Sequence, residues 1–473
     1  MQTDCIRKSL EFHPLGRRKI VARFDGGAIS SDAGGLLLRG VEKATGIIGQ
    51  FARCFTDHRD AECIEHSVEE LLAQRVYALC LGYEDLIDHD ALRCDPLLAA
   101  LVGKLDPTGQ DRKRASDRGK ALAGKSTLNR LELTKEAALD SAGKKDRYKR
   151  IEVNPSAVER LAVDLFVQAH PVAPAQIILD LDATDDPIHG NQEGRFFHGY
   201  YGGYCYLPLY VFCGEFLLCS KLRSSNIDAS FGALDEVARI VEQIRAQWPQ
   251  VRILLRGDSG FCREPIMAWC EKHAVGYLFG LARNARLEKA IEAELAQAQA
   301  LFGQTQQPAR VFAEFAYQTL DSWSRARRVV AKAEHLEKGS NPRFVVTTLD
   351  GDPKTLYEKL YCARGEMENR IKEQQLSLFA DRTSAATMRA NQVRLWFSSF
   401  AYILMQALRR LALKGTEMEK AQCQTIRLKL LKIGAQVKVT VRKVWVSLAQ
   451  GCPYQELFIR AHENLRRATP LRC

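Results

Sequence analysis

The sequence contains no C-x-x-C pair, although it has 14 cysteines in 473 residues. Scattered single cysteines argue against a zinc ribbon or finger, and against a disulfide-stapled secreted domain. No uncharged apolar run reaches the roughly 20 residues that a membrane span requires. The first residues, MQTDCIRKSLEFHPLGRRK, lack the apolar core of a signal peptide. We therefore expect a protein of the reducing cytoplasm.

Internal repeats and low-complexity tracts are also missing. Hydrophobic residues make up 46% and charged residues 26% of the chain, which is an ordinary globular composition with room for two or three domains. Short apolar runs and amphipathic segments alternate in the middle of the chain, which predicts a mixed α/β sheet. The expected strands are 176–182, 205–212, 215–222, 251–258 and 276–282, with helices at 228–247 and 263–273, further strands within 308–349, and long helices at 353–379 and 386–413.

The region before this sheet is predicted to be mostly helical. A glycine turn and a helix are expected within 24–45, with Ser31 as N-cap, followed by helices at 66–83 and 90–104. Residues 104–150 are polar and strongly charged, with RKR at 112–114 and KKDRYKR at 144–150. That stretch is either a solvated linker or a surface that faces a polyanion.

The charge balance is strongly positive, with a net charge of +11 and a pI near 9.0. Such an excess favours a polyanionic partner, of which nucleic acid is the commonest, over a basic enzyme that has none. Residues 402–473 alone hold fourteen Lys or Arg against four acids. If 426–448 is extended, one face of the strand carries the cations Arg427, Lys429, Lys438 and Arg442. We expect this face to contact DNA phosphates. The alternative is a solvated sheet edge, where basic residues serve only to prevent aggregation.

One short match is set aside. GKALAGKS at 119–126 fits the phosphate-binding pattern G-x-x-x-x-G-K-[ST]. That loop needs a buried strand before it, so that backbone amides and a helix N-terminus converge on phosphate. The preceding DRKRASDR cannot form such a strand, so an ATPase is not expected.

Acidic residues collect at the ends of two predicted strands. Asp180, Asp182, Asp185 and Asp186 lie on or just after QIILDLD, and Asp258 ends VRILLRGD. Asp180 and Asp182 point to the same side of a strand because the side-chain period is two. Carboxylates at the tip of an apolar strand are costly unless they are solvated, paired or bound to metal. Two such strands in one sheet favour a metal site over ordinary loop aspartates.

A third acidic element is the predicted helix that contains YCARGEMENRIKEQQ. Tyr361, Arg364, Glu368, Lys372 and Gln375 are spaced so that they share one helix face. A solvated face with i,i+4 ion pairs is the alternative. Three converging carboxylates can hold two Mg²⁺ or Mn²⁺ ions, which prefer oxygen ligands and suit in-line phosphoryl displacement.

Four blocks resemble the DDE transposases of bacterial insertion sequences, in the branch with a Tyr-Arg-Glu-Lys signature. More narrowly, they resemble the thirteen-eighty insertion-sequence family. The blocks are FDGGAISSDAGGLLL, LDLDATDDPIHGNQEGRFFHGYYGGY, LLRGDSGF and YCARGEMENRIKE. They span the chain from Phe24 to near its basic end.

The resemblance implies an RNase H-like catalytic core in which Asp182, Asp258 and Glu368 are both catalytic residues and ligands of two Mg²⁺ or Mn²⁺ ions. The family's Asp-x-Thr context selects Asp182 over Asp180. Where the family signature has its lysine, this chain has Gln375. This departure weakens the expected binding of DNA ends unless Lys372 takes the place of the missing lysine.

The expected DNA-binding residues are Tyr361, Arg364, Lys372 and Trp323. Trp323 either is exposed among arginines and stacks on an unpaired base, or is folded onto its own hairpin. The resemblance also implies a β-rich insertion at about 285–350, between the second Asp and the Glu.

The expected organisation is a helical DNA-binding and assembly region (1–165), a catalytic domain (166–413) and a basic C-terminal segment (414–473). The expected function is a bacterial, nucleoid-associated DNA transposase that acts as a homodimer on double-stranded terminal repeats and target DNA. Two alternatives remain open: a metal-dependent nuclease without strand transfer, and a catalytically silent, transposase-derived DNA-binding protein.

Overall fold

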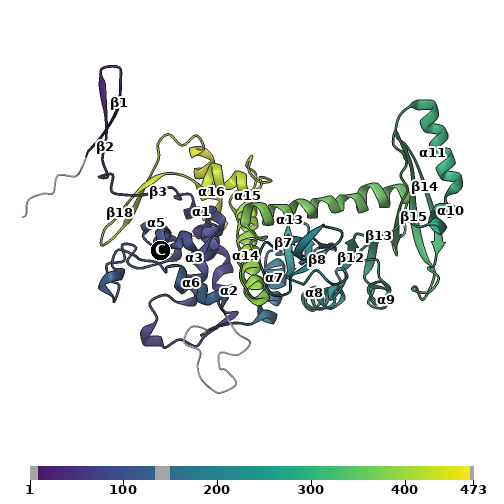
Figure 1. Cartoon of the computed structure of the whole chain (residues 1–473), viewed down its shortest axis with the longest axis horizontal. Helices are drawn as coiled ribbons and strands as arrows, with labels where there is room; N and C mark the ends of the chain where they lie inside the picture. The colour runs from purple at the N-terminus through teal and green to yellow at the C-terminus, as the bar shows by residue number, and fades with distance from the viewer. Residues whose placement is uncertain (1–8, 134–149, 469–473) are drawn as a thin grey trace, which may run out of the picture. The chain divides into compact units, whose positions relative to one another are not determined.

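The structure is a computed structural model that describes residues 9–133 and 150–468 (Figure 1). Most of KKDRYKR, at 144–149, falls outside them. The chain divides into two compact units, one formed by residues 1–152 with 404–473 and the other by 153–403. The basic C-terminal segment, expected as a separate part, therefore belongs to the same unit as the N-terminal region. No helix among the described residues is long and apolar enough to cross a membrane.

The first unit is built mainly from helices. Its helices are α1 (Gly35–Thr45), α2 (Ile47–Ala52), α3 (Val68–Leu81), α4 (His89–Leu92), α5 (Pro96–Val102), α6 (Lys125–Glu132), α15 (Cys423–Ile426) and α16 (Gln455–Ala468). Its strands are β1 (Leu10–Leu15), β2 (Arg18–Ala22), β3 (Ala28–Ser30), β4 (Phe55–Asp57), β5 (Ile151–Val153), β18 (Ala435–Val439) and β19 (Val444–Leu448). Helix α3 begins with a capping box between Ser67 and Glu70. Helix α1 begins after Gly34 without a side-chain cap, so the prediction of Ser31 as N-cap was wrong.

The FDGGAISSDAGG block binds the C-terminal segment. Strand β3 pairs with β18, and the amide of Gly34 donates to the carbonyl of Leu431 over 3.1 Å. A Cβ on Gly34 would overlap the carbonyl oxygen of Leu430, so only glycine allows this approach. Buried Asp32 forms a 2.6 Å ion pair with Lys432. The glycines and Asp32 therefore join two segments that are far apart in the sequence.

The basic segment 426–448 is not continuously extended. Residues 427–431 form a π-helical turn, and only β18 and β19 are strands. Arg427 is buried and donates to the carbonyl oxygens of Cys80 and Leu79, so its predicted place on an exposed cationic face was wrong. Lys438 does lie on the exposed side of β18. Basic and apolar residues alternate in this stretch as they would in a strand, but its first part is a helical turn. Arg427 in that turn donates hydrogen bonds to backbone carbonyls and does not face solvent.

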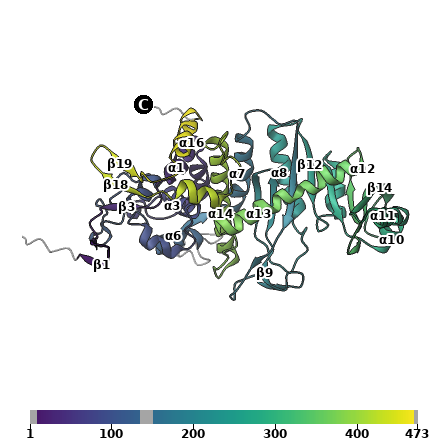
Figure 2. The same cartoon turned by 90° about the horizontal axis from the view of Figure 1, so that it is seen from above.

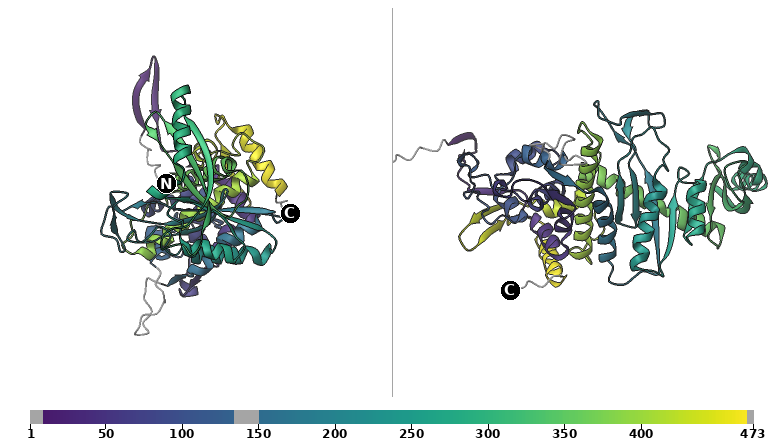
Figure 3. Two further views of the ribbon diagram at one scale, coloured as in Figure 1. Left: turned by 90° about the vertical axis from the view of Figure 1, so that its right-hand side faces the viewer. Right: turned by 90° about the horizontal axis from the view of Figure 1, so that it is seen from below.

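The second unit contains a mixed nine-stranded sheet with the strand order β11-β10-β6-β12-β13-β17-β15-β14, and β16 pairs with β15 (Figure 3). Its strands are β6 (Gln176–Ala183), β10 (Leu209–Cys213), β11 (Phe216–Lys221), β12 (Arg252–Gly257), β13 (Gly276–Leu281), β14 (Ala309–Tyr317), β15 (Arg327–Leu336), β16 (Gly339–Ser340) and β17 (Arg343–Thr347). Strands β6, β12 and β13 run parallel, and the other pairings are antiparallel. The predicted mixed α/β sheet is confirmed.

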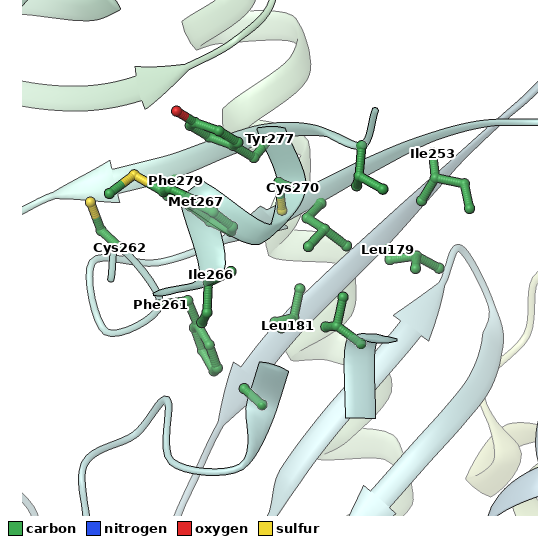
Figure 4. Close-up of a cluster of buried hydrophobic side chains, with 14 of the residues drawn as sticks. Leu179, Leu181, Ile253, Phe261, Cys262, Ile266, Met267, Cys270, Tyr277 and Phe279 are labelled. Atoms are coloured by element: carbon green, nitrogen blue, oxygen red, sulfur yellow. The ribbon is translucent and has the colours of Figure 1, made fainter. Parts of the chain in front are cut away.

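Helices cover one face of this sheet and form the main core with it. They are α7 (Pro155–Gln168), α8 (Ala233–Gln247) and α9 (Glu264–Lys272). Leu179, Leu181, Ile253 and Phe279 point to this side and pack against helix residues such as Met267 (Figure 4). The alternate residues of the same strands therefore point to the opposite face.

That opposite face is covered by the segment after β17. It comprises α12 (Pro353–Thr355), a π-helical turn η4 (Leu356–Tyr361), a 3-10 turn η5 (Cys362–Arg364) and α13 (Gly365–Leu378). Leu356 and Tyr357 pack there against Leu254 and Leu278. The single long helix predicted at 353–379 is therefore interrupted. Helix α14 (Met388–Leu411) follows and runs from the second unit into the first.

The expected insertion contains helices as well as strands. Helices α10 (Ala285–Ala290) and α11 (Glu292–Thr305) precede β14, and α11 packs on β14 and β15 (Figure 1). Strand β17 pairs with β13, so the inserted strands continue the main sheet. The segment 287–305, rich in Ala, Glu, Leu and Gln, has high helix propensity, which explains why it is not β-structure.

Gly34→Ala is expected to destabilise the first unit, because the new methyl group must displace the backbone at Leu430. The expected cost is at least about 2 kcal/mol, as for overpacked cores. Calorimetric unfolding of the full chain would measure it. Gly49→Ala is the matched control, because a Cβ at Gly49 meets only ordinary contacts at 3.7 Å. An equal melting temperature for the two variants would contradict the role of Gly34.

Candidate active site

The register of the parallel strands places Asp182 beside Asp258. Leu181 of β6 lies opposite Gly257 of β12, so the residues that follow them are neighbours at adjoining strand ends. Asp182 belongs to the alternate set of β6 that faces away from α7, α8 and α9. Both carboxylates therefore come from the sheet edge that the sequence predicted, on the side covered by α13.

Asp180 has a different environment. Its carboxylate receives two hydrogen bonds from Arg256, at 2.5 and 2.8 Å, and both side chains are buried. Arg256 lies directly opposite Asp180 in the register and also donates to the carbonyl of Leu360 in η4. Asp180 is thus fully engaged in a structural ion pair, which leaves Asp182 as the acid at the strand end.

Glu368 in α13 and Asp182 both lie next to the side chain of Arg364. The guanidinium of Arg364 lies 3.0 Å from Glu368 Oε1 and 3.6 Å from Asp182 Oδ1. The pKa of Asp182 is raised to about 7, mainly by burial; the charge of Arg364 lowers it, and the charges of Asp258 and Glu368 raise it. Asp258 and Glu368 are therefore both close enough to act electrostatically on Asp182.

Tyr361 approaches the same place from η4. A Cβ on Gly280 of β13 would lie 2.5 Å from its hydroxyl oxygen and 3.2 Å from the backbone of Asp258. Glycine at this position therefore lets the tyrosine sit against the strand. Burial raises the pKa of Tyr361, so the phenol is neutral at physiological pH.

The kinds of atoms present fit a divalent metal ion. Three carboxylates supply hard oxygen ligands, and the pKa of Asp182, raised mainly by burial and in part by the charges of Asp258 and Glu368, marks an anion that a bound cation would stabilise. Across residues 9–133 and 150–468, however, no three acidic, His or Cys side chains are grouped as a ready coordination shell. Arg364, which lies between Asp182 and Glu368, serves as their cation in this structure.

Comparison with known proteins assigns the chain to a family. The family model for the transposase DDE domain, group 1, matches residues 12–470. The chain belongs to this family of DNA transposases. No curated protein matches the sequence.

Among solved structures, the chain is similar to a piggyBac transposase in a synaptic complex with hairpin DNA, at 10% sequence identity. That likeness has a TM-score of 0.41 and covers 85% of this chain and 80% of the other. The family assignment of the chain rests on the family model alone.

In this transposase-family chain, Gln375 is directed into the fold. Its Nε2 donates to the carbonyl of Asp185 over 3.1 Å and to the carboxylate of Asp186 over 2.9 Å. Asp186 is completely buried, and burial raises its pKa to about 8. Lys372, on the same helix, is exposed. Gln375 thus stabilises a buried acid just beyond β6, while Lys372 is left on the surface.

Trp323 is only 6% exposed, so the first of the two alternatives, an exposed side chain that stacks on a base, is not observed. Its indole packs edge-on against Tyr317 at 5.8 Å, with the Arg327 guanidinium 5.4 Å from the ring centre. Arg327 pairs in turn with Glu264 and Glu271 of α9. The alternative, in which Trp323 folds onto its own hairpin, is the one observed.

Two features of the site escaped the sequence analysis. The first is Arg256 in VRILLRGD. A charged residue inside an apolar strand indicates a buried partner of opposite charge. The second is the aromatic run FFHGYYGGY at 196–204, which was used only as part of a resemblance. Its density of aromatic residues and glycines was the available signal.

The raised pKa of Asp182 predicts a pH-dependent stability difference between wild type and Asp182→Asn. Ionisation of Asp182 destabilises the folded state, so metal-free wild type should lose stability relative to the variant as pH rises from about 4 to about 7. The difference should be on the order of a few kcal/mol above that window. Thermal unfolding in EDTA at several pH values measures it.

Millimolar Mg²⁺ or Mn²⁺ should then stabilise wild type more than the variant at pH above this window. A variant that is less stable than wild type at every pH, with no selective effect of the ion, would contradict the electrostatic interpretation of the site.

Proposed function

We propose that this protein is a DNA transposase that cuts DNA at transposon ends and joins the freed ends to target DNA. The observation that carries the proposal is that Asp258, from the adjoining strand, and Glu368, from α13, both lie close enough for their charges to act on Asp182. Family membership supplies the reaction class. The strand order β11-β10-β6-β12-β13, with the first three antiparallel and the last two parallel to β6, supports an RNase H-like core.

We further propose that the three carboxylates hold Mg²⁺ or Mn²⁺, with two ions in each site. When bound, such ions would activate the attacking oxygen and neutralise the leaving oxygen of an in-line displacement at phosphorus. The protein's part is to hold the carboxylates on rigid elements. Asp182 must lose its proton to bind a cation, and its raised pKa makes that loss dependent on pH.

Arg364 is proposed to grip the DNA phosphate. Its guanidinium presents several donors in a planar fork, and Nη1 has no hydrogen-bond partner within the described part of the chain. With metal ions held by Asp182 and Glu368, Arg364 would be free to donate to a non-bridging phosphate oxygen. Tyr361, held against Gly280, can donate its hydroxyl proton to the same phosphate group.

The proposed partner is double-stranded DNA, both at terminal repeats and at the target, with two copies of the chain holding a pair of ends. The net charge of +11 is consistent with such a polyanionic partner. A strand-transfer assay distinguishes this function from that of a nuclease that never rejoins DNA.

Asp182→Ala, Asp258→Ala and Glu368→Ala should each reduce metal-dependent cleavage by at least about a thousandfold, because charge stabilisation in the transition state is lost. Binding to the DNA ends should remain largely intact. The substrate is a linear DNA that carries the inverted repeats flanking the coding sequence, and the products are resolved on denaturing gels.

Asp180→Asn is the variant to compare with these three. It breaks a buried ion pair, so it should lower the free energy of unfolding by about 3–5 kcal/mol while the cleavage rate of the folded fraction changes less. Cleavage at the wild-type rate by any two of the three alanine variants would refute the assignment of the site.

Lys372→Ala should weaken binding to DNA ends and lower the salt dependence by about 0.9 on a log–log scale, as expected for one phosphate contact. Gln375→Lys should leave that binding nearly unchanged, because the side chain at 375 is directed at Asp186. Anisotropy titrations over a range of salt concentrations measure both. Tighter binding by Gln375→Lys, with no effect of Lys372→Ala, would reverse the two roles.

A further inference from the structure

A small sheet after β6 carries a concentration of exposed aromatic side chains. It contains β7 (Asp186–Pro187), β9 (Gly203–Tyr206) and β8 (Phe196–His198) in that order, and its hairpin extends away from the main sheet (Figure 2). Tyr200 is 86% exposed and Phe197 is 60% exposed. The full set of exposed aromatic residues on this hairpin is Phe196, Phe197, Tyr200, Tyr201 and Tyr204. We call it the aromatic hairpin.

The pairing of the strands spreads these rings over several sides. Phe197 lies opposite Tyr204, and the two rings meet edge to face at 5.7 Å. Phe196 pairs with Cys205 and so points to the other face. Arg195 stacks its guanidinium 4.0 Å from the centre of the Tyr204 ring. The rings therefore do not form one flat apolar patch of the kind that a second protein surface would cover.

The turn between the strands leaves space around the rings. Gly199, Gly202 and Gly203 have no neighbouring atoms where a Cβ would lie, and Gly202 has a φ of +68°. Tyr200 and Tyr201, between these glycines, meet edge to face at 5.0 Å. The glycine positions of this turn are therefore open to an approaching ligand.

The aromatic hairpin lies next to the strand end that carries Asp182. The hydroxyl of Tyr201 is 3.4 Å from the carbonyl oxygen of Ala183, the residue after Asp182. The pKa of Tyr201 is raised to about 12 by burial and by the charges of Asp185 and Asp182. The aromatic hairpin is thus a direct neighbour of the proposed cleavage site.

Exposed aromatic rings interleaved with an arginine are the chemistry that binds unpaired nucleic-acid bases. Bases stack on rings with little regard to sequence, and Arg adds cation–π and phosphate contacts. Bases inside a duplex have their faces covered, so only unpaired bases can use the rings. Unpaired bases arise where a transposase separates strands at a cut.

We propose that the aromatic hairpin binds unpaired DNA bases beside the cleavage site, with Phe197, Tyr200 and Tyr204 as stacking surfaces and Arg195 contacting the backbone. This proposal rests on the proposed function for the source of the unpaired bases. It also assigns the base-stacking role to a segment different from the one that holds the buried Trp323.

The test compares two fluorescent DNA probes in EDTA, namely a blunt duplex and the same duplex with a single-stranded thymidine tail. Wild type should bind the tailed probe more tightly. Phe197→Ala with Tyr200→Ala should weaken binding to the tailed probe by about fivefold to a hundredfold and leave binding to the blunt probe unchanged. Tyr200→Phe should restore most of the preference when Phe197 is intact, because the ring is kept.

Phe231→Ala is the matched control, because Phe231 is 65% exposed in the same unit but lies outside the aromatic hairpin. It should bind both probes like wild type. Photocrosslinking of a bromodeoxyuridine tail should label peptides that contain residues 195–204. No preference for the tailed probe, or an equal loss on both probes in the double variant, would overturn the proposal. So would a change of oligomeric state of that variant without DNA, because it would indicate a protein interface.

The outcome is separable from that of the proposed function. Asp182→Ala should keep the full preference for the tailed probe, because stacking needs no cleavage. A wild-type protein that cuts DNA but shows no preference refutes only the aromatic hairpin. A protein that prefers the tail but never cuts refutes only the proposed catalysis.

Discussion

The buried pair between Asp180 and Arg256 determines the geometry of the active site. It connects neighbouring strands at matched positions, and Arg256 extends the connection to the carbonyl of Leu360. Each of these anchor points lies a short distance along the chain from a carboxylate of the site: Asp182, Asp258 and Glu368. Because a buried guanidinium has its donors satisfied in one arrangement only, the three elements cannot slide past one another without losing charged hydrogen bonds.

The site combines this rigid base with a surplus of negative charge. Asp182, whose side chain is 14% exposed, lies near two other carboxylates, and Arg364 pairs with both it and Glu368. Such an arrangement lowers the stability of the folded state but favours the binding of cations. Catalytic sites commonly lose stability in this way in exchange for function. The helical turn before α13 contributes by placing Tyr361 and Arg364 on the side of the sheet where the acids emerge. A π-helical turn at this point agrees with the frequent occurrence of such turns at functional sites.

Much of this could be predicted from the sequence, for identifiable reasons. Apolar strands that end in aspartate located Asp182 and Asp258, and the spacing around Glu368 placed Arg364 one turn before it, as the ion pair confirms. The environments of Trp323, Arg427 and Gln375 could not be predicted, because each depends on residues distant in the chain. The polar neighbours of Trp323 left open whether its side chain is exposed or folded onto its own hairpin, and only its contacts with Tyr317 and Arg327 decide between the two. Arg427 looked like part of an alternating strand, but its partners are the carbonyls of Leu79 and Cys80.

The pairing of β13 with β17 has a consequence for how the chain can vary. Strand β13 follows Asp258 after α9 and pairs with β12, and β17 returns antiparallel beside β13 before the helix of Glu368 begins. The distance in space between these two acids is therefore set by hydrogen bonds across the strand pairs β12–β13 and β13–β17. The number of residues that separates them in sequence has little influence on it. Segments between the two strands, such as the turns around α10 and α11, can lengthen or shorten at small entropic cost while the acids stay in place. The insertion is thus a region where size and surface can diverge without disturbing the chemistry.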